Sequence, residues 1–156
     1  MKKITLILAV FLVFCLNIEN RASAVTALWV KCGTDTKCTK QASGFTFPLD
    51  VPNYKMRAKN NLIEIKYPYD KHREVYVRKS PIALNNGDIS GVNDNFPVKK
   101  QIKMKDDKKI NVRGYSNEFF VATFSIDKNY YSIYCKNGLK KKHINEIYEK
   151  IQESNL

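Results

Sequence analysis

Short runs in which apolar and polar side chains alternate are the feature that most constrains the fold of this chain. In residues 62–69, Ile63, Ile65 and Tyr67 share one face of a predicted strand, and a period of two is typical of strands with one buried face. Comparable runs cover residues 74–79, 102–105, 110–112, 119–126 and 130–135. Short polar turns separate several of them, at residues 70–72, 106–108 and 127–129. This succession predicts antiparallel hairpins.

Two further strands are expected before residue 50. Residues 25–31 alternate, and residues 45–49 alternate with an interruption at Pro48. Asn137 and Gly138 are turn-forming residues, and we expect them to end the last strand.

The C-terminal segment has a different period. Its apolar residues recur at i, i+3, i+4 and i+7, the spacing of one helical face, at Ile144, Ile147, Tyr148 and Ile151. This pattern predicts an amphipathic helix over residues 140–152. The expected fold class is α+β or mainly β, with a curled antiparallel sheet of six to eight strands and one C-terminal amphipathic helix packed on it.

The first 24 residues have the pattern of a bacterial secretory signal peptide. Two lysines precede an apolar run of 13 residues, which would span about 20 Å as a helix, against roughly 30 Å for a bilayer core. The sequence Ala-Ser-Ala at residues 22–24 suits a cleavage site. We expect residues 1–24 to be removed, leaving residues 25–156 as a single secreted or periplasmic β-rich domain without a transmembrane segment. A retained membrane anchor is the alternative.

The cysteines of the expected mature chain are odd in number. Cys32, Cys38 and Cys135 remain, and an oxidising compartment favours one disulfide and one free thiol. The turn-rich residues between Cys32 and Cys38 favour a bridge between these two. A bridge from Cys135 to either of them is the alternative, and otherwise Cys135 is expected to be a small buried residue.

Residues 80–97 lack a clear period and contain repeated Pro, Gly, Asn and Asp. A long segment of this kind in a small domain is typically functional or mobile, so we interpret it as a candidate binding loop, with an ordinary connection as the alternative. The candidate binding residues are Asn85, Asn86, Asp88, Ile89, Val92, Asn93, Asp94 and Asn95.

The chain is strongly basic. Its formal net charge of +12 falls to +10 when three cations and one anion leave with residues 1–24. This charge favours a protein partner with an acidic surface or an anionic envelope polymer. The densest cluster of cations is a candidate anion patch formed by Lys140, Lys141, Lys142 and His143. A solvated first turn of the helix is the alternative, although cations at a helix N-terminus oppose the macrodipole.

We expect no catalytic, cofactor-binding or metal-binding residues. His72 and His143 are the only histidines, and the common hydrolase, zinc and phosphate-loop motifs are absent from the sequence. The spacing of Asp88 and residues 93–95 does not match a calcium loop. Aromatic and basic residues are interleaved at residues 66–78, a pattern suited to nucleic-acid bases, but export argues against such a partner.

These observations predict an exported, small, basic binding protein that is not an enzyme. We expect an inhibitor or immunity protein that covers the acidic cleft of an envelope-acting enzyme, because glycoside hydrolases carry paired carboxylates in their clefts. One alternative is a secreted or surface virulence-type factor that binds anionic envelope polymers, and another is a small secreted hydrolase.

Overall fold

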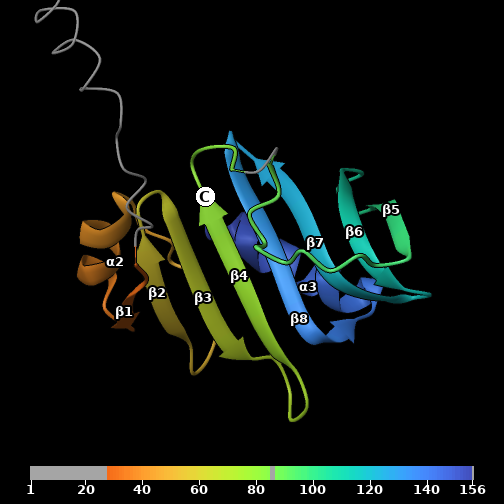
Figure 1. Ribbon diagram of the computed structural model, residues 1–156, viewed down its shortest axis with the longest axis horizontal. Helices are drawn as coiled ribbons and strands as arrows, with labels where there is room; N and C mark the ends of the chain where they lie inside the picture. Colours follow the sequence, from red (N-terminus) through yellow and green to blue (C-terminus); the bar gives the residue numbers. More distant parts are fainter. Residues whose placement is uncertain (1–27, 85–86, 156) are drawn as a thin grey trace, which may run out of the picture.

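The computed structural model describes residues 28–84 and 87–155 (Figure 1). The expected signal peptide at residues 1–24 lies outside the described residues, as does the start of the strand expected at residues 25–31. The described chain forms eight strands and two helices, in the order β1 (Val30–Gly33), α2 (Thr36–Ser43), β2 (Lys55–Lys59), β3 (Leu62–Pro68), β4 (Glu74–Ser80), β5 (Val98–Lys103), β6 (Lys109–Tyr115), β7 (Glu118–Ile126), β8 (Asn129–Leu139) and α3 (Lys141–Glu153).

All eight strands form one antiparallel sheet, in the order β1-β2-β3-β4-β8-β7-β6-β5. The sheet consists of two four-stranded meanders, β1–β4 and β5–β8, each of which runs from an outer edge to the centre. There β4 pairs with β8. The prediction of an antiparallel sheet of six to eight strands is confirmed, and the fold is mainly β. The sheet is open rather than barrel-like.

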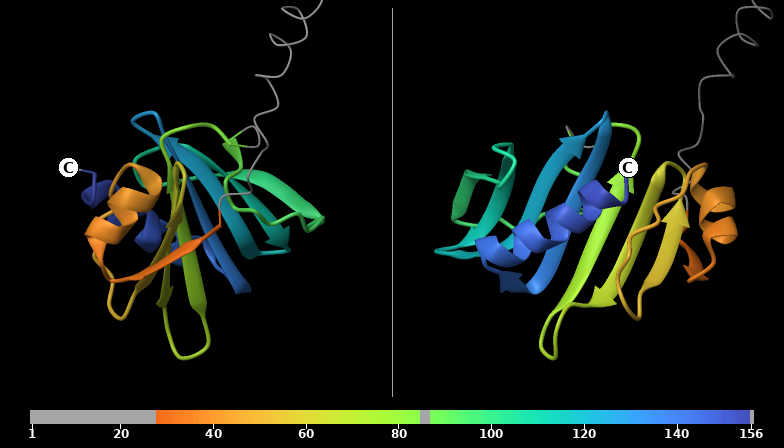
Figure 2. Two further views of the ribbon diagram at one scale, coloured as in Figure 1. Left: turned by 60° about the vertical axis from the view of Figure 1, so that its left-hand side comes forward. Right: turned by 180° about the vertical axis from the view of Figure 1, so that it is seen from behind.

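One face of this sheet carries the hydrophobic core. Ile65, Val77 and Ile133 are direct neighbours across β3, β4 and β8, and all three are buried. Helix α3 lies across this face (Figure 2) and buries the predicted apolar stripe of Ile144, Ile147, Tyr148 and Ile151. The prediction of a C-terminal amphipathic helix is therefore confirmed, with bounds shifted by one residue.

Helix α2 is an element that the sequence analysis missed, since it assigned residues 33–37 to a turn. Its first turn is capped by the Asp35 carboxylate, which accepts hydrogen bonds from the backbone N–H groups of Lys37 and Cys38 at 2.8 and 3.2 Å. Gly44 ends the helix in the left-handed conformation, at φ 88°. The helix carries no stripe of large apolar residues, so its period gave no signal.

Several strand expectations were wrong in detail. Leu28 and Trp29 belong to no strand, so β1 begins later than expected, and β5 covers Val98–Lys103 rather than residues 102–105. Residues 45–49 form no strand, and Phe47 and Leu49 instead pack into the core as part of an irregular segment. Strand β2 was not expected, because three of its five residues are basic. Strand β8 does not end at Asn137 but continues to Leu139, with Gly138 at φ 70° beside an irregularity in the β7–β8 register.

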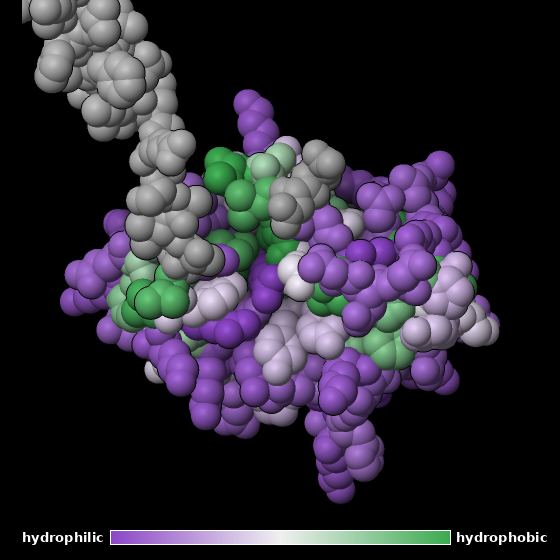
Figure 3. Space-filling model, in the orientation of Figure 1, coloured by the Kyte–Doolittle hydropathy of each residue, from purple (hydrophilic) through white to green (hydrophobic). Residues whose placement is uncertain are grey.

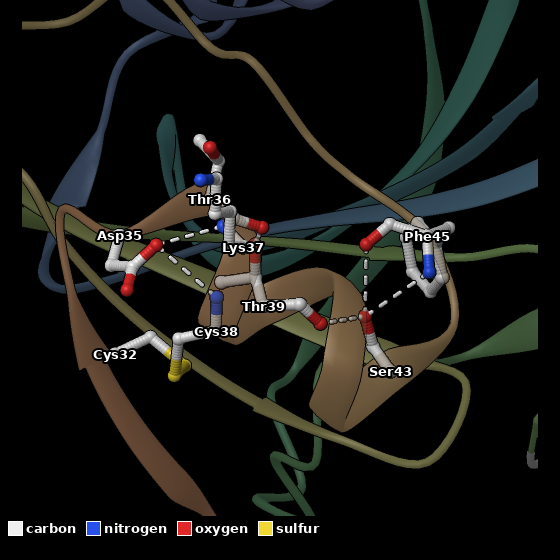
Figure 4. Close-up of a disulfide and its surroundings, with 8 residues drawn as sticks. All are labelled: Cys32, Asp35, Thr36, Lys37, Cys38, Thr39, Ser43 and Phe45. Atoms are coloured by element: carbon white, nitrogen blue, oxygen red, sulfur yellow. Dashed lines mark hydrogen bonds between the residues drawn. A yellow bond between two sulfur atoms is a disulfide. The ribbon is translucent and has the colours of Figure 1, made fainter.

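A disulfide joins Cys32 on β1 to Cys38 on α2, as expected (Figure 4). The bridge fixes the first turn of α2 against the edge of the sheet. Cys135 lies on β8 as a buried free cysteine, and burial raises the pKa of its thiol. No helix within the described ranges is long and apolar enough to cross a membrane.

The thiol count of the native protein follows from this arrangement. We expect a chain without residues 1–24 to show no thiol that reacts with an aromatic disulfide reagent under native conditions, because Cys135 is 0% exposed and its thiolate is disfavoured. Unfolding without reductant should expose one thiol, and reduction should raise the count to three. Rapid labelling of the native protein, or three thiols before reduction, would contradict the assignment.

Candidate functional site

The face of the sheet opposite α3 carries a continuous row of polar side chains. The row crosses all eight strands, because each residue is the direct cross-strand partner of the next, and direct partners project from the same face. We call it the polar row, and it runs Lys31, Arg57, Glu64, Arg78, Ser132, Thr123, Asn111 and Gln101. The next row on this face includes Lys55, Lys66, Tyr76, Tyr134 and Arg113.

Glu64 lies in the polar row as a buried charge that two arginines neutralise. Its side chain is 2% exposed. Arg57 donates from Nε to Oε1 at 2.6 Å and from Nη2 to Oε2 at 3.1 Å. Arg78 donates from Nε to Oε2 at 2.8 Å. A buried carboxylate is tolerated only when it is paired in this way, so Glu64 fixes both guanidinium groups; we call the three residues the arginine cluster.

Trp29 covers the arginine cluster from the β1 edge. The guanidinium carbons of Arg57 and Arg78 lie 4.3 and 5.5 Å from its ring centroid, within the range of cation–π attraction. Trp29 is the only tryptophan of the chain, so its fluorescence reports on this cluster.

The arginine cluster also anchors the loop that follows β4, which crosses the polar face in Figure 1. Arg78 donates from Nη1 to the carbonyl oxygens of Ile89 and Ser90 at 3.1 and 2.5 Å. A side chain at Gly91 would collide with the same guanidinium. A second anchor is Arg113, whose Nη2 forms an ion pair with Asp88 at 2.7 Å and donates a hydrogen bond to the Ser90 hydroxyl at 3.0 Å.

A cavity of about 410 Å³ lies between this loop and the sheet. It is lined by the arginine cluster, by Tyr76, Ser132 and Tyr134 from the sheet, and by residues 90–94 of the loop. A second cavity of about 400 Å³ adjoins it over β1–β4 and shares part of its lining, with Lys31, Lys55 and Lys66 as further cations. Figure 3 shows this face as largely hydrophilic, with a hollow near its centre. Together the two cavities form a basic groove.

The candidate binding residues of the loop occupy three different environments. Ile89 is buried beneath the loop, and Asp88 is half-buried against Arg113. Val92 is half-buried at the cavity. The exposed candidates are Asn93, Asp94 and Asn95. Asn85 and Asn86 lie outside the described residues.

The candidate anion patch is divided by the fold. Lys140, Lys141 and Lys142 are exposed at the start of α3, whereas His143 is 8% exposed. The Nδ1 atom of His143 lies 2.7 Å from Nη1 of Arg73 and accepts a hydrogen bond from the Lys140 backbone N–H at 3.3 Å. Burial and the neighbouring cations lower the pKa of His143, so its neutral ring joins the start of α3 to the β3–β4 turn.

The remaining polar candidates serve local structure. His72 lies exposed in the β3–β4 turn, where its backbone N–H donates to Asp70 at 2.9 Å. The Arg73 guanidinium, aided by that backbone bond, lowers the pKa of Asp70 to about 2. Within residues 28–84 and 87–155, no group of three His, Cys, Asp or Glu side chains is arranged to hold a metal ion.

No protein-family model, curated protein or solved structure matches this chain. The interpretation of the site therefore rests on its geometry alone. Arg57, Glu64, Arg78 and Ser132 were not predicted as site residues from the sequence. Their convergence depends on the register of four strands. The alternating runs indicated only that Glu64 and Arg78 lie on the polar sides of their strands.

Proposed function

We propose that this protein is an exported, non-enzymatic binding protein, periplasmic or secreted, that recognises an acidic protein surface through its polar sheet face. The observation that carries the proposal is the anchoring of the loop. Arg78 and Arg113 hold the loop across the sheet, so that exposed residues 93–95 project beside a basic groove. A disulfide between β1 and α2 suits an oxidising compartment.

This arrangement favours an inhibitor or immunity protein over a protein in which the loop is only a connection between β4 and β5. A preordered loop loses little entropy on binding, and the surrounding cations steer an acidic partner toward it. The acidic cleft of an envelope-acting glycoside hydrolase has the complementary charge.

A second candidate function rests on Lys140, Lys141 and Lys142. The three are exposed neighbours, and none forms an ion pair with a described residue. Such a patch suits an anionic envelope polymer. Binding of that kind depends on charge alone and is lost when salt screens it.

Capture from envelope extract separates the two candidates. The wild-type chain is compared with two triple-alanine variants, one at residues 93–95 and one at residues 140–142. Each is washed with about 1 M salt, at which the interaction between exposed charges extends only about 3 Å. We expect one protein to survive the wash on the wild type and on the lysine variant, and to fall at least about ten-fold on the loop variant. The proposal would be overturned if the loop variant retained the captured protein at full strength. It would also be overturned if capture were lost only in the salt wash and in the variant at residues 140–142.

A further inference from the structure

We propose that the cavity between the loop and the arginine cluster is a binding site for a carboxylate group, carried by a small sugar acid or by the C-terminal residue of a peptide. The inference concerns a small ligand within the sheet face, and it does not depend on the partner protein proposed above.

Ser132 gives the first reason. Ser132 lines the cavity, and its hydroxyl is buried and has no hydrogen-bond partner among the described residues. An unsatisfied buried hydroxyl is destabilising, and buried polar groups in native proteins are nearly always hydrogen-bonded. A ligand oxygen in the cavity would accept this hydrogen bond.

The arginine cluster gives the second reason. Nη1 of Arg57 and Nη2 of Arg78 make no hydrogen bond to the described part of the chain, whereas the other two guanidinium nitrogens of each arginine donate hydrogen bonds. Glu64 and the loop carbonyls hold both guanidinium groups in place. Each of these two nitrogens can donate to an oxygen of a bound carboxylate, and such charge-assisted bonds are among the strongest.

The other residues that line the cavity favour a ligand that carries one negative charge and has hydroxyl or amide groups beside it. Two arginines and Glu64 leave one positive charge beside the free guanidinium nitrogens. Asp94 at the exposed rim brings the formal charge of the lining to zero, which disfavours a dianion such as phosphate. Asp94 also offers an acceptor to a hydroxyl or amide N–H beside the bound carboxylate. Tyr76 and Tyr134, whose ring centroids lie 5.7 Å apart, form a wall against which a sugar ring or a short side chain packs.

Trp29 fluorescence tests the proposal directly. The probes are glucuronate, N-acetyl-alanyl-alanine, its C-terminal amide, glucose and inorganic phosphate, each titrated into the full mature chain. We expect a saturable change with at least one carboxylate probe, and the tighter of the two identifies the source of the group. Glucose and the amide should give no saturable change. The proposal fails if neither carboxylate saturates by about 10 mM, or if the amide or phosphate binds as tightly as the carboxylates.

Variants locate the binding. Ser132→Ala removes only the unpaired hydroxyl, so we expect an unchanged or higher melting temperature and a carboxylate affinity at least about five-fold weaker. Arg57→Gln should weaken binding about ten-fold or more. The matched control is Lys103→Gln, which removes the same charge from an exposed side chain on β5, at the opposite edge of the sheet, and should leave affinity within two-fold. Equal affinity of the Ser132 and Arg57 variants with the wild type would overturn the assignment, and calorimetry repeats the test without the fluorophore.

Discussion

Ile147→Asp is expected to lower the free energy of unfolding by about 5 kcal/mol, because it combines the loss of a core side chain with a buried unpaired charge. Ile147 is 1% exposed at the centre of the α3 stripe, pressed against the apolar face of the sheet. The change equals the whole stability of many domains, so we expect a largely unfolded variant. Urea denaturation followed by circular dichroism measures the effect.

Two substitutions serve as controls, one for helix propensity and charge and the other for the loss of core packing. Lys142→Asp introduces the same side chain into the same helix at an exposed position, and it should leave stability unchanged or slightly raised, since an anion in the first turn suits the helix dipole. Ile147→Val should lower the free energy of unfolding by only about 1 kcal/mol. An Ile147→Asp chain as stable as the Lys142→Asp chain would show that this face of α3 is not packed.

The same stripe explains why the core of this fold was predictable. In α3 and in strands such as β3 and β7, burial of one face imposes a period that is written in consecutive residues. Where burial leaves no such period, prediction failed. Helix α2 depends on its caps, Asp35 and Gly44, and strand β2 presents mainly basic residues, so neither contains an apolar pattern long enough to detect.

The candidate site was hidden for a different reason. Glu64 and Arg78 are 14 residues apart in sequence, and Ser132 is more distant still. Glu64 and Arg78 are neighbours because β3 pairs with β4. Ser132 joins them only because β4 pairs with β8 in one particular register, in which Arg78 lies opposite Ser132. Alternation indicates which face a residue occupies, but it does not indicate which residue of a distant strand lies beside it. The anion patch shows the reverse error: Lys142 and His143 are adjacent in sequence, yet one is exposed and the other buried.

Glu64→Gln is expected to lower the free energy of unfolding by about 3 kcal/mol, because it leaves the Arg78 guanidinium without its counter-ion. The change keeps the size of the side chain and removes only its charge. Arg78 is 17% exposed, so water compensates for the loss only in part. Thermal and urea unfolding of the wild type and the variant measure the difference.

Glu74→Gln is the matched control, since it makes the same chemical change in an ion pair on the neighbouring strand. The Lys66–Glu74 pair has side chains 43% and 46% exposed, and removing an exposed pair costs less than about 1 kcal/mol. Because Arg78 also holds the loop through Ile89 and Ser90, Arg78→Met should itself be destabilising. The Glu64→Gln, Arg78→Met double variant should then be less destabilised than the sum of the two single variants by about 2 kcal/mol. Strict additivity, or equal effects at Glu64 and Glu74, would show that Glu64 does not hold the arginines in place, and the preordered guanidinium pair on which carboxylate binding depends would be absent.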